Sequence, residues 1–255
     1  MYEYNTVNVE IVNSIAVVKF NRPKALNALS TEMTKELSDL FDKLALDGSV
    51  RGIILTGEGK VFMAGADITE MKEWGAFEGR EFARLSNCTF SKIAEIGKPT
   101  VGAVNGFALG AGLEIALCCD WRIASENAVF AAPEVTLGII PSGGGTQRLP
   151  RLIGSGRAKE LIFTGKRINA DEAEKIGLVN KDLMDEAMNS LGRALSNSSV
   201  ALKYAKEAID TGMSLDLNSG INVEINSAGM VFASEDKNEG VAAFLEKRKP
   251  NFKNK

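Results

Sequence analysis

The sequence contains no histidine. Ser-His-Asp triads, Cys-His pairs and histidine metal sites are therefore excluded, and acid–base chemistry must use Glu, Asp, Lys, Tyr or Cys. Only three cysteines occur, Cys88, Cys118 and Cys119, and none forms a Cys-x-x-Cys pair, which argues against disulfides and zinc. Because Cys118 and Cys119 stand in an apolar run, we expect them to be small buried hydrophobic residues.

Basic charge, long apolar runs and a leader sequence are also lacking. The 30 Lys and Arg against 33 Asp and Glu give a net charge of −3, unlike the basic footprint of nucleic-acid-binding domains. Apolar runs break within about a dozen residues, short of the ~18 that a membrane span needs. Residues 1–4 have neither the basic nor the apolar region of a signal peptide. We expect a cytoplasmic protein with no nucleic-acid or membrane partner.

The 255 residues, 45% apolar and 25% charged, suit a globular protein with a sizeable core. Residues 7–11 alternate apolar and polar side chains, and the apolar run 15–18 with Phe20 reads as a second strand, which together predict a hairpin turning at Asn13-Ser14. Ser30 or Thr31 can cap a helix with the apolar stripe Met33, Leu37, Leu40, Phe41 and Leu44.

Strands and helices are then expected to alternate. The pattern predicts strands over 50–56 and 100–104 and helices over 82–96 and 111–119, which is typical of an α/β fold with a largely parallel sheet. Beyond about residue 196 the pattern is helical, with helices predicted over 200–210, 215–232 and 237–247. We therefore predict an α/β core over residues 1–195, with the active site, and a helical region over 196–255.

The 25 glycines do not form a standard nucleotide-binding loop. No G-x-x-x-x-G-K-[ST] segment occurs, and Gly110-Ala111-Gly112 is followed by Ile115 where a dinucleotide fingerprint needs glycine. The run Gly143-Gly144-Gly145 does not follow a clear strand. These glycines are expected to allow tight turns and close backbone approach.

Two glutamates stand in apolar surroundings. Glu114 is the only charge between Thr100 and Cys119, so we expect it to be buried, and a buried carboxylate needs partners or a proton. The residues alone leave open a catalytic acid or a structural one in a buried hydrogen-bond network. Glu134, 20 residues later, reads by itself as a surface-loop glutamate, and the fold alone can bring the two together.

The small residues Ala64-Gly65-Ala66-Asp67 can expose backbone N–H groups. By itself this segment reads as a strand-to-helix turn with Asp67 as the helix N-cap.

Together these pieces resemble the crotonase (enoyl-CoA hydratase/isomerase) family, most closely a short-chain enoyl-CoA hydratase. The matching segments run in order over nearly the whole chain: residues 21–29, 64–68, 105–114, 133–141, 144–149, 177–180 and 244–249. The resemblance implies a crotonase-like spiral of β-β-α units. It also implies that the helical C-terminal region builds trimers, usually paired into hexamers.

The resemblance further implies a CoA thioester substrate. Because the sequence has no histidine, no Cys motif and no nucleotide loop, we expect no other cofactor and no metal. It places an oxyanion hole on the N–H groups of Ala66 and Ala111, a Cα-proton role on Glu134 and a water-activating role on Glu114. Free N–H groups at a helix start suit a developing negative charge. The positions implied to contact CoA are Lys24, Ala25, Leu26, Ala64, Asp67, Ile68, Phe244 and Lys247, with Phe244 and Lys247 often acting from a neighbouring subunit.

The activity implied is reversible addition of water to a trans-2-enoyl-CoA, in fatty-acid β-oxidation or butyrate-type metabolism. An enoyl-CoA isomerase of the same family needs only one proton carrier, so the presence of both Glu114 and Glu134 argues against it. A non-catalytic CoA-binding oligomer is the other alternative, and two idle carboxyl groups in apolar settings argue against it.

Overall fold

The computed structural model describes residues 2–181 and 184–255. The chain forms two compact units, one made of residues 1–94 and 100–188, the other of residues 95–99 and 189–255. The predicted division into an active-site core over 1–195 and an assembly region over 196–255 stays a prediction.

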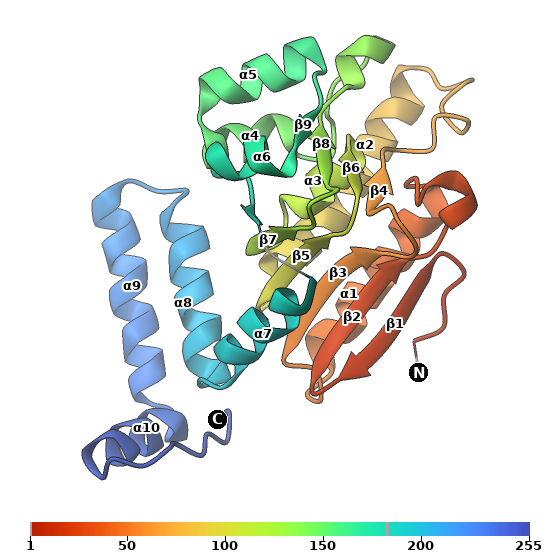
Figure 1. Cartoon of the computed structure of the whole chain (residues 1–255). Helices are drawn as coiled ribbons and strands as arrows, with labels where there is room; N and C mark the ends of the chain where they lie inside the picture. Colours follow the sequence, from red (N-terminus) through yellow and green to blue (C-terminus); the bar gives the residue numbers. More distant parts are fainter. Residues whose placement is uncertain (1, 182–183) are drawn as a thin grey trace. The chain divides into compact units, whose positions relative to one another are not determined.

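The larger sheet of the first unit has the order β1-β2-β3-β5-β7-β10 (Figure 1). Only β1 and β2 are antiparallel, and the other neighbours are parallel, as the sequence predicted. Asn13 and Ser14 both have positive φ, 52° and 63°, which is the twist that a two-residue hairpin needs. The strands are β1 (Val7–Val12), β2 (Ile15–Phe20), β3 (Gly52–Gly57), β5 (Thr100–Val104), β7 (Trp121–Ala124) and β10 (Asn180–Lys181).

A second sheet has the order β4-β6-β8-β9 and was not predicted. Its strands are only two or three residues long, too short for apolar alternation to identify. The strands β4 (Met63–Ala64), β6 (Phe107–Leu109) and β8 (Val129–Ala131) are parallel, and β9 (Ile168–Asn169) is antiparallel to β8. The chain leaves β3, β5 and β7 of the first sheet and next enters β4, β6 and β8 of the second.

Helix α1 (Thr31–Leu46) is capped by Ser30, whose hydroxyl accepts the Met33 N–H at 3.1 Å, and it buries the predicted apolar stripe. Helix α2 (Ala76–Glu95) begins ahead of the predicted residue 82, because its first turn is exposed and has no buried apolar stripe. Helix α3 (Ala111–Ala116) ends before the predicted Cys119. The remaining elements are η1 (Pro23–Ala25), η2 (Glu134–Leu137), α4 (Gly145–Ile153), α5 (Ser155–Thr164), α6 (Ala170–Lys175) and α7 (Met184–Leu195).

The second unit is helical, as predicted, with α8 (Ser199–Gly212), α9 (Leu217–Phe232) and α10 (Glu235–Leu245). Asp236 is 2% exposed and accepts hydrogen bonds from the Ser198 hydroxyl and from the N–H groups of Lys253 and Asn254. This carboxylate therefore ties α8, α10 and the following segment together. In the described ranges, no helix combines the length and apolar character of a membrane span.

Candidate active site

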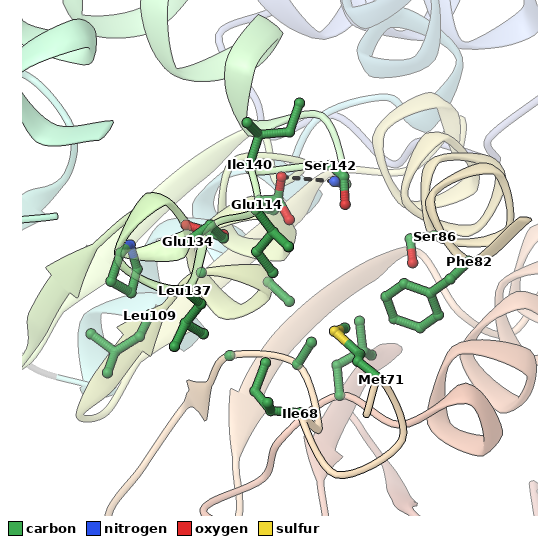
Figure 2. Close-up of a pocket in the computed structure, with 18 of the residues that line it drawn as sticks. Ile68, Met71, Phe82, Ser86, Leu109, Glu114, Glu134, Leu137, Ile140 and Ser142 are labelled. Atoms are coloured by element: carbon green, nitrogen blue, oxygen red, sulfur yellow. Dashed lines mark hydrogen bonds between the residues drawn. The ribbon is translucent and has the colours of Figure 1, made fainter. Parts of the chain in front are cut away.

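The first unit contains an apolar pocket with an empty volume of about 690 Å³. Its walls come from β4 and the turn after it, from α2, from the β6–α3 junction and from the segment around η2. Two carboxyl groups, those of Glu114 and Glu134, lie among otherwise mostly apolar side chains (Figure 2). The fold thus brings to one pocket two acids that lie 20 residues apart in the sequence.

Glu114 lies on α3 with 5% of its surface exposed, so the predicted burial is confirmed. Its Oε1 accepts hydrogen bonds from the N–H groups of Gly143 and Gly145, each at 2.8 Å. Burial raises the pKa of Glu114 because the charged form loses hydration, while these two donors and the nearby Arg148 cation favour the charged form. The carboxyl group is therefore held in a fixed orientation by main-chain donors.

The glycine loop that binds Glu114 is anchored on two sides. Asn87 of α2 donates from Nδ2 to the Ser142 carbonyl at 2.5 Å, and Arg148 donates to the Gly143 carbonyl at 3.3 Å. A Cβ at position 143 would lie only 2.7 Å from Glu114 Oε2. Glycine is required there because the loop backbone packs directly against the acid.

Glu134 opens η2 and is half-buried. Its Oε2 is buried and finds no hydrogen-bond partner within the described residues. Burial raises the pKa of Glu134 to about 7, an effect opposed by its own backbone N–H and reinforced by the charge of Glu114. The interpretation of Glu134 as a surface-loop residue was wrong, because its carboxyl group lines the pocket.

Gly110 allows the β6–α3 junction to approach Glu134. Its φ of 50° and ψ of −119° suit a residue without a Cβ. A Cβ there would lie 3.0 Å from Glu134 Oε1 and 3.6 Å from the Gly65 Cα. Three segments of the pocket therefore converge at this glycine.

Two backbone N–H groups at the pocket are available as donors. Within the described part of the chain, neither the Ala66 nor the Ala111 N–H makes a hydrogen bond. Ala111 is the first residue of α3, where an N–H has no partner inside its own helix. The Leu29 N–H donates to the Gly65 carbonyl, and the Leu29 carbonyl accepts the Asp67 N–H. The Ala66 N–H, which lies between these two bonds, therefore faces away from Leu29. Ala66 and Ala111 both line the pocket.

Two of the residues expected to contact CoA, Ala64 and Ile68, line the pocket. In the 24–26 segment, the Leu26 carbonyl accepts the Ala64 N–H at 3.1 Å. Ile68 lines the pocket and is 47% exposed. Asp67 forms an ion pair with Arg22 at 2.8 Å, and this contact, which the sequence did not suggest, joins the segments 21–29 and 64–68.

The expected helix N-cap role of Asp67 was wrong. No helix begins near it, because residues 68–73 form turns and α2 starts at Ala76. Asp67 Oδ1 instead accepts hydrogen bonds from the N–H and the hydroxyl of Thr69, at 3.2 and 2.6 Å. The carboxylate therefore stabilises the turn directly after Ala66.

Phe244 and Lys247 belong to the second unit. Phe244 is 83% exposed near the end of α10, and Lys247 follows the helix with φ 55°. Their part in CoA binding stays a prediction. Residues of α2, among them Phe82 and Ser86, also line the pocket, but the sequence analysis missed them because a helix stripe of this kind resembles ordinary core.

The raised pKa of Glu134 gives a pH-dependent stability. Because the folded state binds this proton more tightly than the unfolded chain, the stabilisation is complete below about pH 4.5 and is lost as the pH rises through about 7. Glutamine imitates the protonated acid at every pH. We expect Glu134→Gln to exceed the wild type in stability above pH 7, by at most ~3 kcal/mol.

Melting temperatures of both proteins between pH 4 and 9 measure this effect. The two curves should meet at the acidic end, and the exposed loop variant Glu126→Gln should follow the wild type throughout. A Glu134→Gln protein less stable than the wild type at pH 8 would contradict the assignment.

An apolar pocket with two carboxyl groups of raised pKa and two free N–H donors, on an α/β fold, defines an acid–base enzyme. Among the described residues, no three His, Cys, Asp or Glu side chains form a group that could hold a metal ion. The chain belongs to the enoyl-CoA hydratase/isomerase family, whose model matches residues 10–255.

Individual relatives are similar over their full length. The short-chain-enoyl-CoA hydratase of Clostridium acetobutylicum is 49% identical, over 99% of this chain and 100% of the relative. The crotonyl-CoA hydratase of Syntrophomonas wolfei is 47% identical over 98% of each chain. The crystal structure of an enoyl-CoA hydratase from Bacillus anthracis superposes with a TM-score of 0.94 at 38% identity, over 98% of this chain and 100% of that one.

Proposed function

We propose that this chain is an enoyl-CoA hydratase, which reversibly adds water to a short trans-2-enoyl-CoA to give the 3-hydroxyacyl-CoA. The observation that carries the proposal is the placement of two buried carboxyl groups and two free N–H groups around one apolar pocket. Relatives over 40% identical along the whole chain bear the name of this activity.

The Ala66 and Ala111 N–H groups would form the oxyanion hole. As water adds to Cβ, electron density moves onto the thioester oxygen, and the resulting enolate needs donors that are already in place. Both N–H groups meet this need because neither is used within the described fold. In an apolar pocket such donors stabilise the enolate far more than they would in water.

The two acids would divide the proton transfers. Glu114, with two N–H donors favouring its charged form, binds the water and accepts its proton. Glu134, which burial favours in the protonated form, delivers a proton to Cα. Before hydration the proton is on Glu134, and after hydration it is on Glu114. The reaction therefore needs one ionised and one protonated acid in either direction.

CoA binding is assigned to the Lys24–Leu26 segment, to Ala64, Asp67 and Ile68, and to Phe244 and Lys247. The hydrogen bond from the Ala64 N–H to the Leu26 carbonyl supports placing the Lys24–Leu26 segment and Ala64 in one binding site. No cofactor or metal beyond the CoA thioester is proposed, since the acids and N–H groups supply every proton and charge that the reaction requires.

The test is a spectrophotometric assay with crotonyl-CoA after exhaustive chelation. Loss of the enoyl-thioester absorbance without any added nucleotide or metal is the expected result. Activity restored only by a metal would overturn the cofactor proposal. Conversion of a 3-enoyl-CoA without hydration would indicate an isomerase, and binding without turnover a non-catalytic oligomer.

The finer architecture is proposed in the same way. Passage of the chain from β3 to β4, β5 to β6 and β7 to β8 supports a spiral of β-β-α units. Exposed apolar residues on the second unit support a trimer or a dimer of trimers, among them Met213, Leu217, Ile225, Phe232 and Phe244. A stable, active monomer in sedimentation would contradict this assembly. The cytoplasmic location expected from the sequence stays a prediction.

A further inference from the structure

Helix α2 forms one wall of the pocket with Phe82, Ser86 and Phe90. These residues follow one another at intervals of four, so they share one face of the helix. Ser86 is 2% exposed, and its buried Oγ has no hydrogen-bond partner among the residues described. Buried hydroxyl groups nearly always have a partner, so the unpartnered one in this apolar wall requires an explanation.

The α2 wall extends away from the reacting atoms. A Cβ on Gly143 would lie 2.5 Å from the Phe90 ring and 2.7 Å from Glu114 Oε2, so Phe90 adjoins the acid. Ser86 lies about 6 Å further along the helix axis, because four residues rise by that amount. Glu134 and Ser86 lie on opposite sides of Glu114 in Figure 2.

The acyl tail is the part of the substrate that this wall can meet. The thioester end is held at the Ala66 and Ala111 N–H groups and at the CoA segments, and Glu114 acts at Cβ. Carbons beyond Cβ therefore extend past Phe90 along α2, and only a tail longer than four carbons has the length to reach Ser86.

We propose that Ser86 sets the chain-length preference of the pocket, an inference that rests on the proposed hydratase function. With a four-carbon acyl group, the space beside Ser86 remains open to water, and rotation about the Cα–Cβ bond turns the hydroxyl toward it. An eight-carbon chain fills that space with methylene groups, which leaves the hydroxyl without a partner. The enzyme thereby discriminates against longer chains through an unsatisfied hydroxyl rather than through a steric block.

The experiment compares kcat/KM for trans-2-octenoyl-CoA and crotonyl-CoA in the wild type and in Ser86→Ala. Alanine removes only the hydroxyl and leaves the shape of the wall otherwise unchanged. The octenoyl-to-crotonyl ratio is expected to rise roughly 5- to 100-fold, the effect of one unsatisfied buried hydroxyl group.

Ser125 provides the matched control, since its Oγ is also buried and unpartnered within the described residues but does not line the pocket. Ser125→Ala should keep the wild-type ratio. An unchanged ratio in Ser86→Ala, or an equal rise in both variants, would overturn the assignment of Ser86.

Binding separates this inference from the hydratase proposal. Dissociation constants of butyryl-CoA and octanoyl-CoA, measured by calorimetry, require no turnover. One outcome is a wild type that does not hydrate crotonyl-CoA while Ser86→Ala lowers the dissociation constant of octanoyl-CoA relative to that of butyryl-CoA. That result would overturn the hydratase proposal and support the role of Ser86. If the wild type hydrates crotonyl-CoA and Ser86→Ala changes neither ratio, the inference alone fails.

Discussion

Replacing Glu114 or Glu134 by glutamine is expected to lower the turnover rate of crotonyl-CoA hydration by about 10²–10⁴-fold. Glutamine preserves the shape of the side chain but neither gives up nor takes up the transferred proton. At position 114 its amide oxygen can still accept the N–H groups of Gly143 and Gly145, so the pocket keeps its form. Substrate affinity should therefore change little while the rate falls.

The double variant and proton exchange distinguish the two roles. Groups that act on one transition state behave as a unit, so the combined loss should be much smaller than the product of the single losses. If Glu134 moves the Cα proton, Glu134→Gln should nearly abolish exchange of that proton with solvent, while Glu114→Gln retains part of it. Two well-folded variants with near-normal hydration rates would end the mechanism proposed here.

The second large effect is expected from Ala111→Pro, which deletes one donor of the proposed oxyanion hole. Ala111 is the first residue of α3, a position where proline is tolerated because the missing N–H has no partner inside the helix. A residue before proline avoids the helical region of backbone conformation. Gly110, with a ψ of −119°, already lies outside that region, so it is compatible with proline at position 111. We expect kcat to fall by at least about 10²–10³-fold with the fold retained.

Leu217→Pro is the matched control. Leu217 is likewise the first residue of its helix, α9, is 78% exposed, and follows Asp216, whose side chain caps Asn218 and Ser219 rather than Leu217. Both variants should melt close to the wild type, and only Ala111→Pro should lose activity. A fully active Ala111→Pro enzyme would show that this N–H does not stabilise the enolate.

Local patterns in the sequence predicted much of the fold. The Asn13-Ser14 turn, the Ser30 cap and the apolar stripe of α1 depend on neighbours within a few residues, and each is confirmed. Burial of Glu114 was predictable because every residue around it is apolar. The short strands β4, β6 and β8 were missed because two or three residues carry no measurable period.

The site depends instead on contacts between distant segments. The bonds from Gly143 and Gly145 to Glu114 span 29 and 31 residues, and nothing local in the sequence specifies them. Glu134 resembled a surface residue because the pocket that it lines also includes segments many positions away, such as those of Gly65 and Gly110. The family resemblance identified both acids, but no pattern identified the Ser86 hydroxyl on a helix whose composition is mixed.

Both hydrogen-bond donors to Glu114 belong to the main chain, and so do the two proposed donors to the enolate. A saturation mutagenesis map of this protein should therefore show a sparse pattern of intolerant positions. Substitutions should abolish activity at the two glutamates and at the crowded glycines 110 and 143. Most other side chains around the pocket should tolerate replacement. Proteins that evolve from this fold can therefore acquire new acyl specificities by side-chain substitution, while the main-chain N–H groups that stabilise charge stay in place.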